Sequence, residues 1–230
     1  MGRRPGSRPR EARWRHGEPV AGSQINFPAC GGYGGLVDAN AVLWSASGLL
    51  RYDTAAGTGE CLHFSAYGLG LDPQTGHVWS APFGSTVSEL DPDGNVLNTY
   101  PHGFSSAQGV AVDDTGNVWV AHSLAGGTTV GHVRTDGTLV GNVPLLGGSG
   151  PTGVAVDHNG KVWAANINSS DARRIDPEIG HVGGGGFATG WVDLVVDLGS
   201  GASPYNYSDM TGFVSIGATS PQGFWRVLRS

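Results

Sequence analysis

One short pattern recurs four times along the chain and constrains the fold more than any other feature. Each copy starts with glycine and a short apolar stretch, passes through an aspartate and a turn, and ends in a tryptophan followed by small residues. The four copies occupy 34–46, 68–81, 109–121 and 153–165. Their tryptophans, 35, 40 and 44 residues apart, are Trp44, Trp79, Trp119 and Trp163. This period indicates a repeat architecture in which each unit packs on its neighbours.

Each repeat unit has room for four short strands. In the third unit we expect strands near 109–113, 118–123, 129–134 and 139–144, with hairpin turns at DTGN and TDGT. Asp-Gly pairs between apolar runs are strong hairpin signals. Aspartate accepts backbone N–H bonds across such a turn, and glycine supplies the positive φ. The pattern therefore predicts an all-β fold, a β-propeller of four-stranded antiparallel blades.

Four clear repeats set the expected domain limits. The blades are predicted within 21–190, at about 31–64, 67–100, 108–145 and 152–186. Residues 191–230 hold strand-like pieces without the repeat pattern, and we interpret them as a degenerate fifth blade or the start of a following β module. The chain ends at Ser230 directly after a strand-like piece, which favours an incomplete or small ring. An open edge strand in such a ring invites self-association.

Composition and charge narrow the classes of partner. The chain has 40 Gly among 230 residues, and many of these mark the repeated turns. No apolar run approaches the roughly 20 residues of a membrane-spanning helix, so no membrane span is expected. Six arginines lie in the leader at 1–20, which we interpret as a disordered extension. Residues 17–230 keep 7 basic and 18 acidic residues, a net charge of −11, which argues against a nucleic-acid partner.

Two cysteines, Cys30 and Cys61, leave two interpretations open. An even count is typical of a disulfide in an exported protein, whereas two thiols also occur by chance in a reducing compartment.

Segments 68–97, 109–140 and 153–177 resemble the blades of NHL-type propellers, most closely the streptogramin (virginiamycin B) lyase-like group. A looser similarity, through 109–123 and 175–177, reaches the gluconolactonase and senescence-marker propellers. The resemblance implies a propeller over about 31–212. A catalytic member would be a carbon–oxygen lyase that opens a cyclic depsipeptide ester with a divalent cation such as Mg²⁺, or a lactonase that uses Ca²⁺.

The chain departs from the lyase pattern where the chemistry would lie. After the tryptophans the family has glutamates, whereas this sequence reads Ser80-Ala81, Val120-Ala121 and Ala164-Ala165. The Glu-x-His pair of the family is also missing. We therefore expect a recognition module with no certain cofactor, and keep the lyase and the lactonase, with Mg²⁺ or Ca²⁺, as alternatives.

The loops that enter each blade, together with those between its second and third strands, form the mouth where propellers bind ligands. Two histidines are expected there, His102 and His122, which in the lyase alternative would act as general base or metal ligand. Side chains suited to hydrogen bonding a ligand at the mouth are Tyr67, Gln108, Ser123, Thr152, Asn166 and Asn168. No metal-ligand set can be assigned.

The sequence thus predicts a propeller module of an extracellular or periplasmic, multidomain bacterial-type protein. Its expected partner at the mouth is a peptide, a glycan or a small cyclic ester.

Overall fold

Sixteen strands form four antiparallel sheets in the computed structural model, which describes residues 26–123 and 126–206. In each sheet the strands pair in chain order, because short turns join consecutive strands. The first sheet contains β1 (Gly35–Val37), β2 (Val42–Ser45), β3 (Leu50–Asp53) and β4 (Thr58–Cys61). The second contains β5 (Gly68–Leu71), β6 (Val78–Ala81), β7 (Thr86–Leu90) and β8 (Val96–Pro101).

The third sheet contains β9 (Ala107–Val112), β10 (Asn117–His122), β11 (Thr129–Arg134) and β12 (Leu139–Pro144). These strands lie within two residues of the positions expected from the repeat. The fourth contains β13 (Pro151–Val156), β14 (Val162–Asn166), β15 (Asp171–Asp176) and β16 (Trp191–Asp197). The four sheets confirm the predicted all-β fold with four blades.

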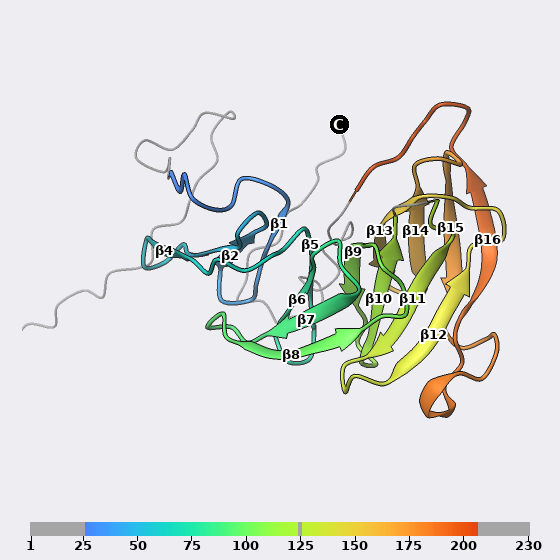
Figure 1. The fold of residues 1–230 in the computed structure, drawn as a ribbon, viewed down its shortest axis with the longest axis horizontal. Helices are drawn as coiled ribbons and strands as arrows, with labels where there is room; N and C mark the ends of the chain where they lie inside the picture. The colour runs from blue at the N-terminus through green and yellow to red at the C-terminus, as the bar shows by residue number, and fades with distance from the viewer. Residues whose placement is uncertain (1–25, 124–125, 207–230) are drawn as a thin grey trace, which may run out of the picture.

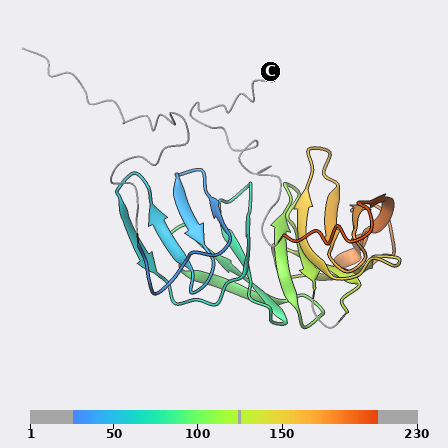
Figure 2. The same cartoon turned by 90° about the horizontal axis from the view of Figure 1, so that it is seen from above.

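The sheets stack face to face in chain order, and a hydrophobic core fills each of the three junctions (Figures 1 and 2). Trp44 packs with Leu69 and Leu71 of the second sheet, and Trp79 packs with Val110 of the third. Trp119 packs with Val154 and neighbouring residues of the fourth. These three tryptophans are 0% exposed, as expected for residues between blades.

The innermost strands, β1, β5, β9 and β13, approach one another where side chains are absent. A methyl group on Gly109 would lie 2.5 Å from the Cα of Gly153, and one on Gly70 would lie 2.8 Å from the carbonyl oxygen of Val110. No comparable packing joins β1 to β13, which stand at the two ends of the row of inner strands (Figure 1). The described residues therefore form an open arc of blades.

The fourth blade ends later than the sequence pattern indicated. Its outer strand is β16, which pairs with β15 from Asp171↔Asp197 to Asp176↔Trp191. The limit of 186 is therefore wrong, and 191–197 belongs to the fourth blade and not to a fifth one or a following module. The cause is the long connection 177–190 between the third and fourth strands of this blade, which includes the 3₁₀ turn η1 (Gly184–Gly186). In the other blades the same connection is short, at 54–57, 91–95 and 135–138.

A disulfide joins Cys30 to Cys61 and decides between the two interpretations of the cysteines. It ties the segment before β1 to the end of β4. Phe27 of the same segment packs edge-on against Tyr52 of β3, with ring centres 5.9 Å apart. The described residues contain no helix whose length and hydropathy would suit a membrane crossing.

Candidate functional site

The mouth of the blade arc lies at the end of the sheets where the inner strands begin. The connections that enter the inner strands are 62–67, 102–106 and 145–150. The described residues between second and third strands lie at the same end, at 46–49, 82–85, 123, 126–128 and 167–170. One position of the repeat stands at the mouth in every blade, five residues before the turn aspartate. It is occupied by Tyr33, Tyr67, Gln108 and Thr152.

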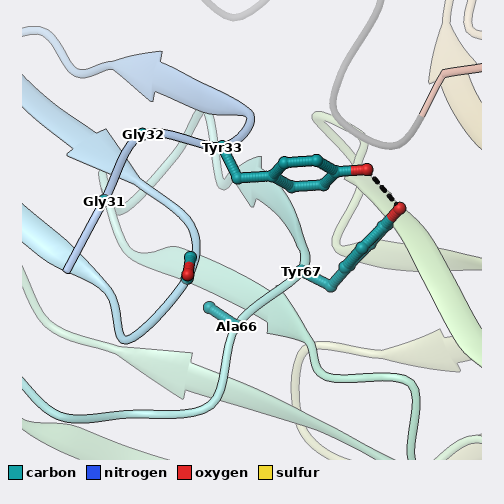
Figure 3. A pocket seen from close by; sticks show the side chains of 6 residues that line it. Gly31, Gly32, Tyr33, Ala66 and Tyr67 are labelled. Carbon is teal, nitrogen blue, oxygen red and sulfur yellow. Dashed lines mark hydrogen bonds between the residues drawn. The ribbon is translucent and has the colours of Figure 1, made fainter.

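A pocket of about 400 Å³ opens at the mouth between the first two blades. Its lining residues are Gly31, Gly32, Tyr33, Ser47, Ala66 and Tyr67. Figure 3 shows the two tyrosines side by side with their hydroxyl groups meeting at one end. The pocket is within the usual size range of small-ligand sites, and none of its lining side chains carries a charge.

Three phenols meet beside this pocket. The hydroxyl oxygens of Tyr33 and Tyr67 are 2.5 Å apart, and the hydroxyl of Tyr205 hydrogen bonds that of Tyr67 and lies 3.4 Å from that of Tyr33. The Tyr67 ring also packs on Phe83, with ring centres 4.0 Å apart. Burial, followed by the hydrogen bond to Tyr205, raises the pKa of Tyr67, so its phenol stays neutral. The result is an aromatic surface with hydroxyl groups at its rim.

The segment 203–206 runs across the mouth ends of the inner strands. The backbone N–H of Ser203 donates to Ser170 Oγ at 3.3 Å, and that of Asn206 donates to Thr152 Oγ1 at 3.1 Å. Thr152 in turn donates to Asn206 Oδ1 at 3.3 Å. Tyr205 reaches the tyrosines of the first two blades, so this segment connects the two ends of the arc.

The two predicted histidines lie side by side but not on the surface. His102 and His122 are both 0% exposed, and His102 Nδ1 is 2.9 Å from His122 Nε2. His102 Nε2 is 3.0 Å from the carbonyl oxygen of Gly84, and His122 Nδ1 is 2.8 Å from Thr129 Oγ1. Since the carbonyl can only accept, His102 donates from Nε2, and in the neutral ring its Nδ1 accepts. His122 therefore donates from Nε2 and accepts the Thr129 hydroxyl proton at Nδ1.

These donor and acceptor roles are those of two neutral rings, the form that burial favours. Burial lowers the pKa of His102, and burial together with the neighbouring His102 lowers the pKa of His122 from 6.5 to about 3. All four ring nitrogens are occupied within the protein, and Phe104 stacks on His122 with ring centres 5.0 Å apart. A general base needs a free lone pair within reach of a substrate proton. The pair is therefore built as an internal polar network.

The surroundings of the pair do not fit Mg²⁺ or Ca²⁺, the cations of the enzyme alternatives. Both cations need several oxygen ligands, chiefly carboxylates and carbonyls. The oxygens next to the pair are the Gly84 carbonyl and the Thr129 hydroxyl, each already bonded to a ring nitrogen. Among residues 26–123 and 126–206, no group of three or more His, Cys, Asp or Glu side chains is arranged to hold a metal ion.

The other predicted binding residues divide by burial. Gln108, Ser123 and Asn166 are buried, and within the described part of the chain Gln108 Nε2, Ser123 Oγ and Asn166 Oδ1 have no hydrogen-bond partner. Asn166 donates through Nδ2 to Asp171 Oδ1 at 2.7 Å. Asn168 is exposed, and its backbone N–H donates to Ser149 O. None of these four lines the tyrosine pocket.

Two residues of the pocket region, Tyr33 and Tyr205, are not among the predicted binding residues. The repeat itself carries the signal for Tyr33, which precedes Asp38 by five residues as Tyr67 precedes Asp72. No such signal marks Tyr205, because it meets the other two tyrosines only through the path of the chain after β16.

Stacked four-stranded antiparallel sheets whose inner strands converge define this structure as a β-propeller. It is similar to a streptogramin B lyase structure, with a TM-score of 0.59, 17% identity, and coverage of 74% of this chain and 56% of the lyase. It is also similar to selenomethionine-substituted virginiamycin B lyase from Staphylococcus aureus, with a TM-score of 0.60, 14% identity, and coverage of 74% of this chain and 57% of that lyase. A third similar structure is hydrazine synthase from Kuenenia stuttgartiensis, with a TM-score of 0.58, 13% identity, and coverage of 78% of this chain and 52% of the synthase.

The chain thus spans little more than half the length of these proteins. At these identities the likeness establishes the fold, and it confirms the resemblance to streptogramin lyase-like propellers at that level. No protein-family model matches the sequence. No curated protein matches it in a sequence comparison.

Proposed function

We propose that this protein is a recognition module of an exported protein that binds an uncharged stretch of peptide or glycan at the mouth of the blade arc. The observation that carries the proposal is the pocket of about 400 Å³ that Tyr33 and Tyr67 help to line. Tyrosine combines a rigid apolar ring with a hydroxyl that donates and accepts hydrogen bonds. This combination suits both the C–H faces of sugars and the side chains and amides of a peptide.

The composition of the pocket supports an uncharged ligand. Its lining consists of the two tyrosines, Ser47, Ala66, Gly31 and Gly32, with no charged side chain. A charged ligand group placed there would lose water without gaining a counter-charge, which costs free energy. Export is supported by the Cys30–Cys61 disulfide, because disulfides persist in oxidising compartments.

The lyase alternative has less support from the site. Its proposed base, His102 or His122, lies buried in a network that uses every ring nitrogen. The tyrosine pocket lies between the first two blades, whereas the histidines belong to the second and third.

The test is binding of the intact chain to glycan and peptide arrays, followed by titration of the retained ligand. We expect Tyr67→Ala to weaken binding by about tenfold or more, since truncating a tyrosine at the centre of a binding surface costs about 2 kcal/mol or more and tenfold corresponds to about 1.4 kcal/mol. Tyr67→Phe keeps the ring and loses only the hydroxyl, so its loss should be smaller. Leu97→Ala, at an exposed position of the outer strand β8, is the matched control and should bind as the original chain does. Equal binding by Tyr67→Ala, or no retention on either array, would contradict the proposal.

A further inference from the structure

The fourth blade presents a face that is covered in every other blade. Trp44, Trp79 and Trp119 are each buried by the following sheet, but Trp163 is half-buried, and no further sheet follows among the described residues. By strand register, Trp163 pairs with Arg174, and Arg174 with Leu194. Leu194 is 38% exposed, and Val196, two residues further along β16, is 36% exposed. We call this surface the Trp163 face.

The guanidinium that lies over Trp163 is already paired with a carboxylate. The Arg174 guanidinium lies 5.8 Å from the centre of the Trp163 ring, and its Nε is 2.9 Å from Asp193 Oδ1. Apolar partners can therefore cover the Trp163 face without burying an unpaired charge.

The described chain already leads toward this face. In the third junction, the inner strand of the fourth blade fills the space over Gly109, where a methyl group would meet Gly153. In the same way, the space over Gly153 is filled by Asn206, whose side chain lies where a methyl group would stand. Asn206 thus occupies the place from which the inner strand of a next blade would continue.

The sequence after Asn206 continues the repeat in a form that lacks the tryptophan. Residues 209–216 read DMTGFVSI, and residues 113–120 read DDTGNVWV, so that Asp, Thr, Gly and Val coincide. The spacing agrees as well. Asp209 follows the end of β16 by 12 residues, just as Asp113 follows the end of β8, and Asp157 follows the end of β12 by 13.

We propose that the Trp163 face binds the chain's own residues 207–230, whose first part adds the two inner strands of a fifth blade. In this alignment Val214 takes the place of Val162, which packs in the third junction, and Ser215 takes the place of Trp163. Val214 then faces Trp163, and Ser215 faces away from it, because side chains alternate along a strand.

The test is hydroxyl-radical footprinting of Trp163 by mass spectrometry in the full chain, with the molar mass measured by light scattering. We expect Trp163 to be protected in a monomer. Val214→Asp should raise the oxidation of Trp163 by about threefold or more, to the level of a chain that ends at Asn206. The reason is that the new carboxylate would be buried against Trp163, and its cost favours detachment of the covering strands. Ser215→Asp is the matched control and should leave the protection unchanged.

Trp79 and Trp119 serve as internal standards, since both lie in junctions that the variants do not touch. Their continued protection shows that the four blades remain folded in every variant. Equal oxidation of Trp163 in the original chain and in Val214→Asp would overturn the proposal. Protection that appears only in a dimer would also overturn it and would assign the Trp163 face to a second copy.

Discussion

At the scale of single residues, the turn aspartate and the tryptophan form a hydrogen-bonded pair in three of the four repeats. The indole Nε1 donates to the carboxylate at 3.0 Å in Asp38–Trp44, 3.1 Å in Asp113–Trp119 and 2.9 Å in Asp157–Trp163. The second blade lacks this bond, and Trp79 Nε1 has no partner within the described residues. The reason lies in the sequence, because Trp79 follows Asp72 by seven residues where the other three pairs are separated by six.

Removing Asp113 should cost more stability than removing Asp72. Asp113 accepts from the backbone N–H groups of Thr115 and Asn117 and from the Trp119 indole. Asp72 accepts backbone N–H bonds only. We expect Asp113→Ala to lower the free energy of unfolding by about 3 kcal/mol, and Asp72→Ala by less, as measured by urea denaturation. Equal losses would show that the indole bond contributes nothing.

The buried histidine pair should make the fold sensitive to mild acid. In the unfolded chain a histidine takes up its proton near pH 6.5, whereas burial lowers the pKa of His102 and brings that of His122 to about 3. As the pH falls below about 6.5, towards about 5, the unfolded state binds more protons, so stability falls by about 1.4 kcal/mol per pH unit through His122, and His102 changes it in the same direction. This range lies above the titration of the carboxylates.

Urea denaturation between about pH 7 and pH 5 measures this slope. His122→Gln keeps a donor and an acceptor in the network but does not titrate, so its slope should be shallower than that of the original chain. His158→Gln changes an exposed turn residue and should leave the slope unchanged. A slope that is the same in all three proteins would contradict the assignment of a neutral pair.

At the scale of elements, strands at the ends of the arc depend on connections that the repeat does not contain. The chain before β1 is held to the first blade by the disulfide and by the packing of Phe27 on Tyr52. In the fourth blade, β16 completes the sheet only after the long connection 177–190. Gly183 and Gly184 of this connection lie directly against the backbone of β12. A methyl group on Gly183 would lie 1.9 Å from Val140 O, so these glycines allow a close backbone contact.

Loss of the disulfide should destabilise the chain by about 3–4 kcal/mol, because the link closes a loop of 31 residues in the unfolded state. The double variant Cys30→Ser, Cys61→Ser removes it, and urea denaturation measures the loss. Reductant should lower the stability of the original chain and leave the double variant unaffected. An unchanged urea midpoint in the double variant would show that the disulfide does not stabilise the folded chain.

At the scale of the whole molecule, the arc holds its blades together at the inner strands, where glycines allow backbones to meet. The mouth pocket depends on this arrangement, since Tyr33 and Tyr67 belong to neighbouring blades and Tyr205 comes from the far end of the described chain. Any change in the angle between blades would separate these side chains.

A methyl group at Gly109 should therefore disturb the junction between the third and fourth blades. At this position Cβ would lie 2.5 Å from Gly153 Cα, and backbone cannot yield as a flexible side chain does. We expect Gly109→Ala to lower the free energy of unfolding by about 2–3 kcal/mol. Gly84→Ala is the control, because Cβ there meets no atom closer than 3.8 Å. Thermal unfolding followed by near-ultraviolet circular dichroism compares the two, and equal stability would show that the junction can widen.

Much of the fold could be predicted from the sequence because the repeat is local. The glycine, aspartate and tryptophan of each unit specify a turn, a strand pair and a buried face within about 15 residues, and this information recurs four times. The outer strand of the fourth blade was not predicted because the connection 177–190 lengthens this repeat unit. The expected end of the blade, at 186, therefore fell inside the connection.

The candidate site could be predicted only in part, and the physical reason is distance along the chain. The sequence by itself determined which end of each blade forms the mouth and placed Tyr67, His102 and His122 there. Only the tertiary structure decided that the two histidines are 0% exposed and bond each other, because burial depends on loops that fold over them. It also decided that Tyr205, 138 residues after Tyr67, joins the phenol cluster. Contacts of that kind follow from how blades stack, which no single repeat encodes.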